Sequence, residues 1–131
     1  MSSTSEKKEA CALHVDVIDD TLVELFEDLV RYEEGFKRKD RRLMEYAARR
    51  LERQADRIDW LYEASIRMGA PRVISEEEKE MLKADIKGIS RAMSEGEDPD
   101  LIDESVFAID KKWKIRLWDK YCECLKKANL I

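Results

Sequence analysis

The stretch "CALHVDVIDDTLVELFEDLVRYEEGF", residues 11–36, decides the fold. Its apolar residues recur at alternating steps of four and three, the spacing of a heptad seam along one side of a long α-helix. This seam consists of Cys11, Val15, Ile18, Leu22, Leu25, Leu29, Tyr32 and Phe36, widened by Phe26 and Val30. Acidic residues occupy the opposite side of the same helix. We therefore predict a helix over about residues 5–35, and we expect residues 1–4 to be disordered.

A second helix is predicted over about residues 40–68, where the same apolar spacing returns. Asp40 is a favourable N-cap, and Gly69 followed by Pro71 ends the pattern. The two seams are out of phase by one residue across "KRKD" at 37–40. An antiparallel hairpin removes this mismatch, whereas one continuous helix with a four-residue stutter would place Asp40 on the seam. We favour the hairpin.

Two further helices are predicted over about residues 75–94 and 99–128. The first opens with a capping box formed by Ser75 and Glu78. Four glycines and two prolines in the whole chain favour long helices over strands. The fold class that follows is all-α: a mostly antiparallel bundle of four to five helices in a single domain, 1–131. The first two helices would form a long heptad-patterned hairpin.

The last predicted helix is apolar on two sides. A break in this helix near Ser105 would raise the number of helices from four to five. One apolar side is enough to cover the core of a bundle. A second side indicates a central helix, or one that also contacts another subunit. The candidate oligomer interface on this second side consists of Phe107, Ile115, Trp118, Cys122 and Leu125.

The composition is typical of a globular protein with an unusually charged surface. Charged residues make up 42% of the chain and apolar residues 44%, which excludes a disordered polypeptide. Abundant Glu, Lys and Arg with almost no Asn, Gln or His resembles the composition of thermophile proteins. Surface helices of a mesophile favour the same residues. No signal-peptide pattern and no run of about 18 apolar residues is found.

The chain contains three cysteines, Cys11, Cys122 and Cys124. An odd number in a chain without a signal peptide predicts reduced thiols and a cytoplasmic location. On one helix, Cys122 and Cys124 point about 200° apart, so they cannot bind a single metal ion together. We expect all three to be core or boundary residues.

Positive charge is concentrated between residues 37 and 57, where nine basic residues stand against four acidic ones in a chain of net charge −5. Within the second predicted helix, every basic residue is Arg. Guanidinium groups bind phosphates and carboxylates bidentately, and Tyr46 and Trp60 could stack on rings. The candidate anion- or partner-binding residues are Lys37, Arg38, Lys39, Arg42, Tyr46, Arg49, Arg50, Arg53, Arg57 and Trp60.

Three interpretations of this arginine-rich side stay open: contact with an acidic protein surface, nucleic-acid binding, or a solvated face. The solvated face would carry ion pairs one helical turn apart, such as Glu45 with Arg49 and Asp56 with Arg53. The negative net charge opposes long-range attraction to nucleic acid.

The residues offer little for catalysis. His14 is the only histidine, and we expect it to be half-exposed on the surface. Ser-His-Asp and Cys-His mechanisms would both depend on it, and a di-iron site of the ferritin type needs histidines on two helices. No glycine-rich phosphate-binding loop is present.

Two acidic stretches, "ELFE" at 24–27 and "LERQAD" at 51–56, loosely resemble the nucleotide pyrophosphohydrolases of the MazG type over about 40 residues. That family is all-α and holds Mg²⁺ with Glu-x-x-Glu on one helix and Glu-x-x-Asp on the next. Here Glu52 and Asp56 are four residues apart rather than three, and Arg53 stands where the family has glutamate. The acids of "ELFE" also lie away from the seam, whereas carboxylates that share Mg²⁺ must converge.

We therefore expect a non-catalytic helical interaction or assembly protein, a homo-oligomeric adaptor without a cofactor, a membrane partner or a small-molecule substrate. The alternative is an accessory nucleic-acid-binding subunit that uses the arginine and aromatic side of the second helix. A second alternative is a MazG-like, Mg-dependent nucleotide pyrophosphohydrolase.

Overall fold

Four long α-helices make up most of the part of the chain that this computed structural model describes, residues 4–69, 72 and 74–129. They are α1 (Thr4–Arg38), α2 (Arg41–Arg67), α3 (Glu76–Ser94) and α4 (Pro99–Lys127). The all-α prediction is confirmed. The helix count is four, because α4 continues through Ser105 without a break. None of the described helices combines the length and the apolar composition needed to cross a membrane.

The helix N-termini follow the capping residues predicted from the sequence. The Asp40 side chain accepts a hydrogen bond from the Leu43 amide at 3.2 Å. Ser75 and Glu78 form the expected capping box, with each side chain accepting from the other's backbone amide. The Asp98 carboxylate caps α4 in the same way. These caps satisfy amide groups that a helix leaves without intrahelical partners, which fixes where α2, α3 and α4 begin.

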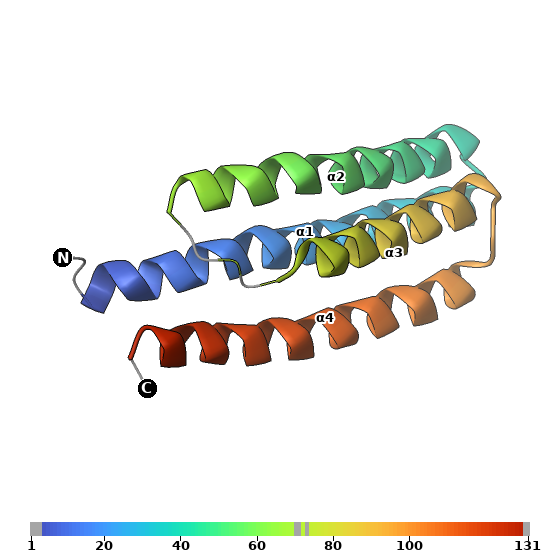
Figure 1. The fold of residues 1–131 in the computed structure, drawn as a ribbon. Helices are drawn as coiled ribbons and strands as arrows, with labels where there is room; N and C mark the ends of the chain where they lie inside the picture. Colours follow the sequence, from blue (N-terminus) through green and yellow to red (C-terminus); the bar gives the residue numbers. More distant parts are fainter. Residues whose placement is uncertain (1–3, 70–71, 73, 130–131) are drawn as a thin grey trace.

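A sharp turn at Lys39 and Asp40 separates α1 from α2. Lys39 has a φ of 58°, the left-handed conformation that a continuous right-handed helix does not contain. The single helix with a stutter is therefore excluded, and α1 and α2 lie side by side and antiparallel (Figure 1). At the other end, α1 already begins at Thr4, so the expected disorder is wrong for this residue. Residues 1–3 lie outside the described part.

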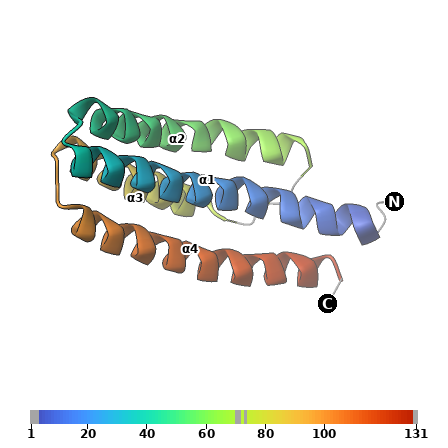
Figure 2. The same cartoon turned by 180° about the vertical axis from the view of Figure 1, so that it is seen from behind.

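The four helices form an antiparallel bundle in which α1 packs against both α2 and α4, while α3 packs mainly against α2 (Figures 1 and 2). The α2 and α4 helices consequently lie at opposite edges of the bundle, at the top and the bottom of Figure 1. The start of α1 and the end of α4 are at the same end of the bundle, together with the end of α2 and the start of α3.

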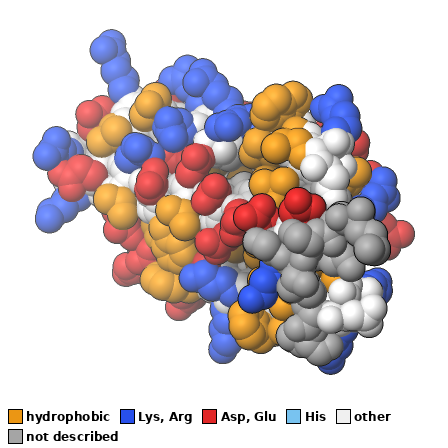
Figure 3. Space-filling view, turned by 90° about the vertical axis from the view of Figure 1, so that its left-hand side faces the viewer, with side chains coloured by type: hydrophobic (Ala, Val, Ile, Leu, Met, Phe, Trp, Pro, Cys, Tyr) orange, Lys and Arg blue, Asp and Glu red, His pale blue; other side chains and the backbone are white. Residues whose placement is uncertain are grey.

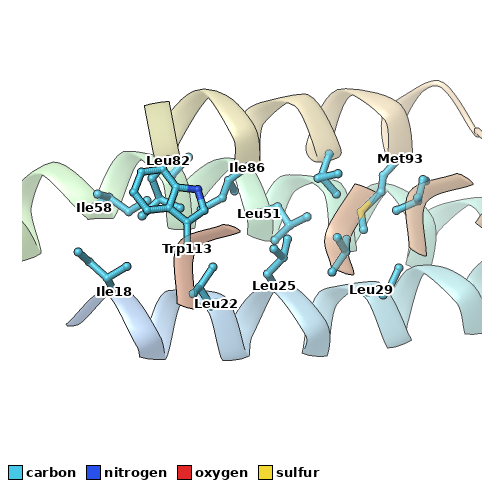
Figure 4. Close-up of a cluster of buried hydrophobic side chains, with 14 of the residues drawn as sticks. Ile18, Leu22, Leu25, Leu29, Leu51, Ile58, Leu82, Ile86, Met93 and Trp113 are labelled. Carbon is cyan, nitrogen blue, oxygen red and sulfur yellow. The ribbon is translucent and has the colours of Figure 1, made fainter. Parts of the chain in front are cut away.

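The core is filled by side chains from all four helices (Figure 4). The largest of them, Trp113 of α4, is fully buried, and its indole Nε1 donates a hydrogen bond to Asp85 of α3 at 3.0 Å. The seam of α1 supplies Ile18, Leu22 and other buried residues to this cluster. Its last member Phe36 is 41% exposed, and its ring lies 6.2 Å from that of Tyr32.

A disulfide between Cys11 and Cys124 joins the start of α1 to the end of α4. The prediction of three reduced thiols is therefore wrong for this pair, and Cys122 alone has a free thiol. An odd number of cysteines does not indicate which thiols pair. The pairing depends on α1 and α4 running antiparallel, which brings Cys11 next to Cys124. The same packing buries Leu125 against the disulfide. Leu125 is only 7% exposed, so it does not belong to the exposed interface predicted for α4.

Candidate functional site

The outward side of α2 carries most of the predicted anion- or partner-binding residues. Tyr46 is 46% exposed and Trp60 is 62% exposed. The basic residues of the set that are also exposed are Lys37, Arg38, Lys39, Arg42, Arg49, Arg53 and Arg57. Basic side chains lie along the upper edge of Figure 3, which is the side of α2. We call Arg42, Arg49, Arg53 and Arg57, with Tyr46 and Trp60, the arginine row.

The four guanidinium groups of the arginine row form no ion pair with any residue that the structure describes. The pairs expected for a solvated face are absent because their acids bind elsewhere. Glu45 pairs with Arg41 at 3.6 Å. Asp56 reaches across to Lys87 of α3 at 3.2 Å. The row is therefore a line of positive charge without ion pairs among the described residues.

Arg50 differs from the rest of its predicted set, because it turns towards α1. Its Nε lies 3.0 Å from Oδ1 of Asp28, whose side chain is fully buried, and Arg31 contacts the same oxygen at 2.8 Å. Burial raises the pKa of Asp28, and the two arginines act in the opposite direction. Arg50 thus compensates a buried charge between α1 and α2 and is not available to a ligand.

Asp28 is not among the residues singled out from the sequence. A signal was present: it directly precedes Leu29 of the seam, so it lies at the border between α1 and the adjacent helix. A carboxylate at that border needs a cation from the neighbouring helix, since an isolated buried charge is very unfavourable.

A second buried ionic cluster joins α2 to α3. Lys79 has a side chain only 6% exposed, lies 2.8 Å from Asp59, and also contacts Glu76. Lys83 pairs with the same Asp59. Hydrogen bonding to Asp59 raises the pKa of Lys79, and hydrogen bonding from Lys79 lowers the pKa of Asp59. These mutual shifts describe a structural ion pair with no free group directed at a ligand.

Two carboxyl groups meet between α1 and α4. A hydrogen bond with Asp103, followed by burial and the nearby charge of Asp100, raises the pKa of Glu33 to about 7. Glu33 therefore keeps its proton over much of the acidic range. This pair lies on the same α1–α4 contact as the disulfide, towards its other end.

Large apolar side chains are exposed along the edge shared by α1 and α4. Three of the predicted interface residues are among them: Phe107, Ile115 and Trp118 are 59%, 56% and 66% exposed. Val23 and Val30 of α1 are 51% and 63% exposed. The Phe26 and Phe107 rings, 5.2 Å apart, join the two helices at the centre of this edge. We call Val23, Val30, Phe107, Ile115 and Trp118 the α1–α4 patch.

One end of the α1–α4 patch is hollowed into a groove of about 300 Å³. Its lining comes from both helices: Ala12, Val15, Asp16, Asp19, Lys114, Leu117, Trp118 and Tyr121. The Trp118 and Tyr121 rings lie 6.3 Å apart on the α4 side. The fourth predicted interface residue, Cys122, is half-buried. The groove is thus an apolar hollow with acids on its α1 side and a lysine on its α4 side.

The acids of the MazG-like stretches do not converge on a metal site. Glu27 and Glu52 are exposed, and Asp56 is paired with Lys87. Within the described ranges, no group of three or more His, Cys, Asp or Glu side chains is placed to hold a metal ion. The side chain of His14 lies outside the described part of the structure.

Comparison with known proteins does not place the chain in a family. No family model, no curated protein and no solved structure matches it. Its function therefore has to be argued from the two surfaces above, the arginine row and the α1–α4 patch.

Proposed function

We propose that this protein is a non-catalytic helical assembly protein, a homo-oligomeric adaptor in which the α1–α4 patch pairs with a second copy of the chain. The proposal rests on five half-exposed apolar side chains of α1 and α4, one of which, Trp118, lines the groove between these two helices. Isolated exposed apolar residues are common on monomers, whereas a contiguous strip with polar margins is typical of an interaction site.

The charges beside the patch favour a second copy as the occupant. The α1 side carries the exposed acids Asp16, Asp19 and Asp20. The α4 side carries the exposed Lys111 and Lys114. Lys114 lines the groove together with Asp16 and Asp19, and it also pairs with Asp110 of its own helix at 3.1 Å. A two-fold axis parallel to the helices places α1 of each copy on α4 of the other, so that acids meet lysines. A two-fold axis across the helices would place acids on acids.

This symmetry also brings an aromatic side chain to the groove. Trp118 of the second copy lies at the level of residues 12–19 of α1, because the two helices run antiparallel with Cys11 opposite Cys124. An exposed tryptophan that enters an apolar hollow is the kind of contact that dominates interface energies. Each copy would contribute one such tryptophan and one such groove.

The experiment is sedimentation velocity at micromolar concentration. We expect a dimer for the natural chain, and Trp118→Glu should raise the dissociation constant about thirtyfold or more, as for a central interface residue. Met81→Glu is the matched control, since Met81 is a 40% exposed apolar residue on α3, away from the patch. It should leave the dimer intact.

The salt dependence of the dissociation constant tests how the two copies are arranged. Contacts between acids and lysines weaken as salt rises, so the dissociation constant should increase between about 50 and 300 mM salt. The substitutions Lys111→Glu and Lys114→Glu together should weaken the dimer at low salt. A natural chain that stays monomeric up to 100 μM in this assay rejects the proposal.

The proposal of a cytoplasmic location rests on the cysteines. It was inferred from three reduced thiols, and the Cys11–Cys124 bond weakens that inference. Such bonds persist mainly in oxidising compartments. The dimer proposed here does not depend on the compartment.

A further inference from the structure

We propose that the arginine row binds single-stranded nucleic acid, with the phosphates on Arg42, Arg49, Arg53 and Arg57 and bases stacked on Trp60 and Tyr46. The inference stands on α2 alone and does not depend on dimerisation through the α1–α4 patch. It starts from the absence of intramolecular partners for these four guanidinium groups among the described residues.

The unpaired arginines are unfavourable for the helix itself. Arg49, Arg53 and Arg57 follow one another at steps of four residues, a spacing at which like charges destabilise a helix by a few tenths of a kcal/mol per pair. Arg42 lies in the first turn of α2, where the helix dipole disfavours cations. No acidic residue stands in that turn. Side chains that are locally unfavourable in this way indicate a role outside the fold.

The spacing of the row fits an extended polynucleotide strand. Four residues of helix rise about 6 Å, close to the distance between successive phosphates in an extended single strand. From Arg42 to Trp60 the row covers about 27 Å of helix, a length suited to several nucleotides. The arginine row on one helix can contact the phosphates of one strand. A duplex presents the phosphates of two strands.

The aromatic residues distinguish nucleic acid from an acidic protein as the ligand. Trp60 and Tyr46 lie on the same outward side of α2 as the arginines and are exposed, although burial would stabilise them more. The Arg50 guanidinium lies 5.9 Å from the centroid of the Tyr46 ring, so Trp60 offers the freer face for a base. An acidic peptide needs cations but has no bases to stack. Aromatic faces beside a cationic track are the arrangement that binds single strands without sequence preference.

Acidic residues flank the row and limit its affinity. Glu52 and Glu63 are exposed on the α3 side of α2. The net charge of −5 adds a general repulsion. Binding should therefore be strongest at low salt and confined to the row itself.

The test measures fluorescence anisotropy of labelled 20-nucleotide oligo-dT and oligo-U at about 50 to 300 mM salt, with a 20-base-pair duplex for comparison. We expect both single strands to bind, and the duplex to bind more weakly. Replacing Arg49, Arg53 and Arg57 by Gln should lower affinity at least tenfold. It should also reduce the slope of log affinity against log salt by about 2, because each lost phosphate contact removes about 0.7.

The matched control replaces three exposed lysines outside the row by Gln: Lys8, Lys126 and Lys127. It changes the net charge equally and should leave affinity within about twofold. Trp60→Ala should weaken binding about tenfold if a base stacks there. Circular dichroism verifies that each variant stays helical.

Three outcomes overturn the proposal. One is the absence of binding to either single strand at about 50 mM salt. Another is an equal loss of affinity in the lysine control, which would reflect net charge alone. The last is that poly-glutamate competes as well as oligo-dT while Trp60→Ala has no effect, which would assign the row to an acidic protein partner.

Discussion

At the scale of single residues, two glycines inside helices have opposite surroundings. Gly35, near the end of α1, faces the first turn of α2. A Cβ there would lie 3.0 Å from the Met44 amide nitrogen and 3.1 Å from the Asp40 carbonyl oxygen. Gly88, in the middle of α3, has no atom within 4 Å of the corresponding position. The first glycine permits the close approach of two helices, and the second contributes only backbone entropy to the unfolded chain.

Alanine substitutions should therefore change stability in opposite directions. Gly88→Ala should stabilise the fold by about 0.5–1 kcal/mol through helix propensity. Gly35→Ala should destabilise it by about 1–2 kcal/mol, because the backbone of the α1–α2 turn has to move. Urea unfolding followed by circular dichroism gives both values. A stabilising Gly35→Ala would mean that the two helices are less tightly joined than described here.

At the scale of helices, the Cys11–Cys124 disulfide holds together the ends of α1 and α4, which are 113 residues apart in sequence. A cross-link over a loop of this length restricts the unfolded chain strongly, with an upper limit of about 4–5 kcal/mol in the chain-entropy account. We expect the double substitution Cys11→Ser with Cys124→Ser to cost about 3–4 kcal/mol. For a chain of 131 residues this lowers Tm by about 10–15 °C.

Calorimetry with and without a reductant checks this prediction. The reductant should lower the Tm of the natural chain and of Cys122→Ser, whose free thiol is not cross-linked. It should have no effect on the double variant. If the natural chain melts at the same temperature with and without reductant, the bond is absent or contributes nothing.

The helices themselves were predictable because their signals are local. Apolar spacing located α1 and α2, and the caps at Asp40 and Ser75 fixed where helices begin. The pairing of Cys11 with Cys124 and of Asp28 with Arg50 was not predictable, since each depends on which helices become neighbours. Exposure of the arginine row followed from helical periodicity. The lack of ion pairs in the row did not follow from periodicity. Asp56 could pair with Arg53 of its own helix or with Lys87 of α3, and in the structure it pairs with Lys87.

At the scale of the whole molecule, the pH dependence of stability should reflect the contact between α1 and α4. The disulfide closes one end of this contact, and the Glu33–Asp103 carboxyl pair lies towards the other. Glu33 has a pKa of about 7 in the folded chain and an ordinary value of 4.5. Between these values the folded state holds a proton that the unfolded state has released, so the free energy of unfolding falls as pH rises.

We expect Glu33 to contribute about 1–2 kcal/mol to the free energy of unfolding below pH 4.5, after allowance for solvent screening. This contribution is lost as the pH rises through about 7.

Glu33→Gln keeps a neutral hydrogen-bond donor next to Asp103 and should make stability less dependent on pH between 5 and 8. Glu27→Gln, on the exposed side of α1, should leave that dependence unchanged. Urea midpoints measured at intervals of half a pH unit give both slopes. Identical slopes in the natural chain and in Glu33→Gln would show that Glu33 does not retain its proton in this pH range and that α1 and α4 are separated further at this end.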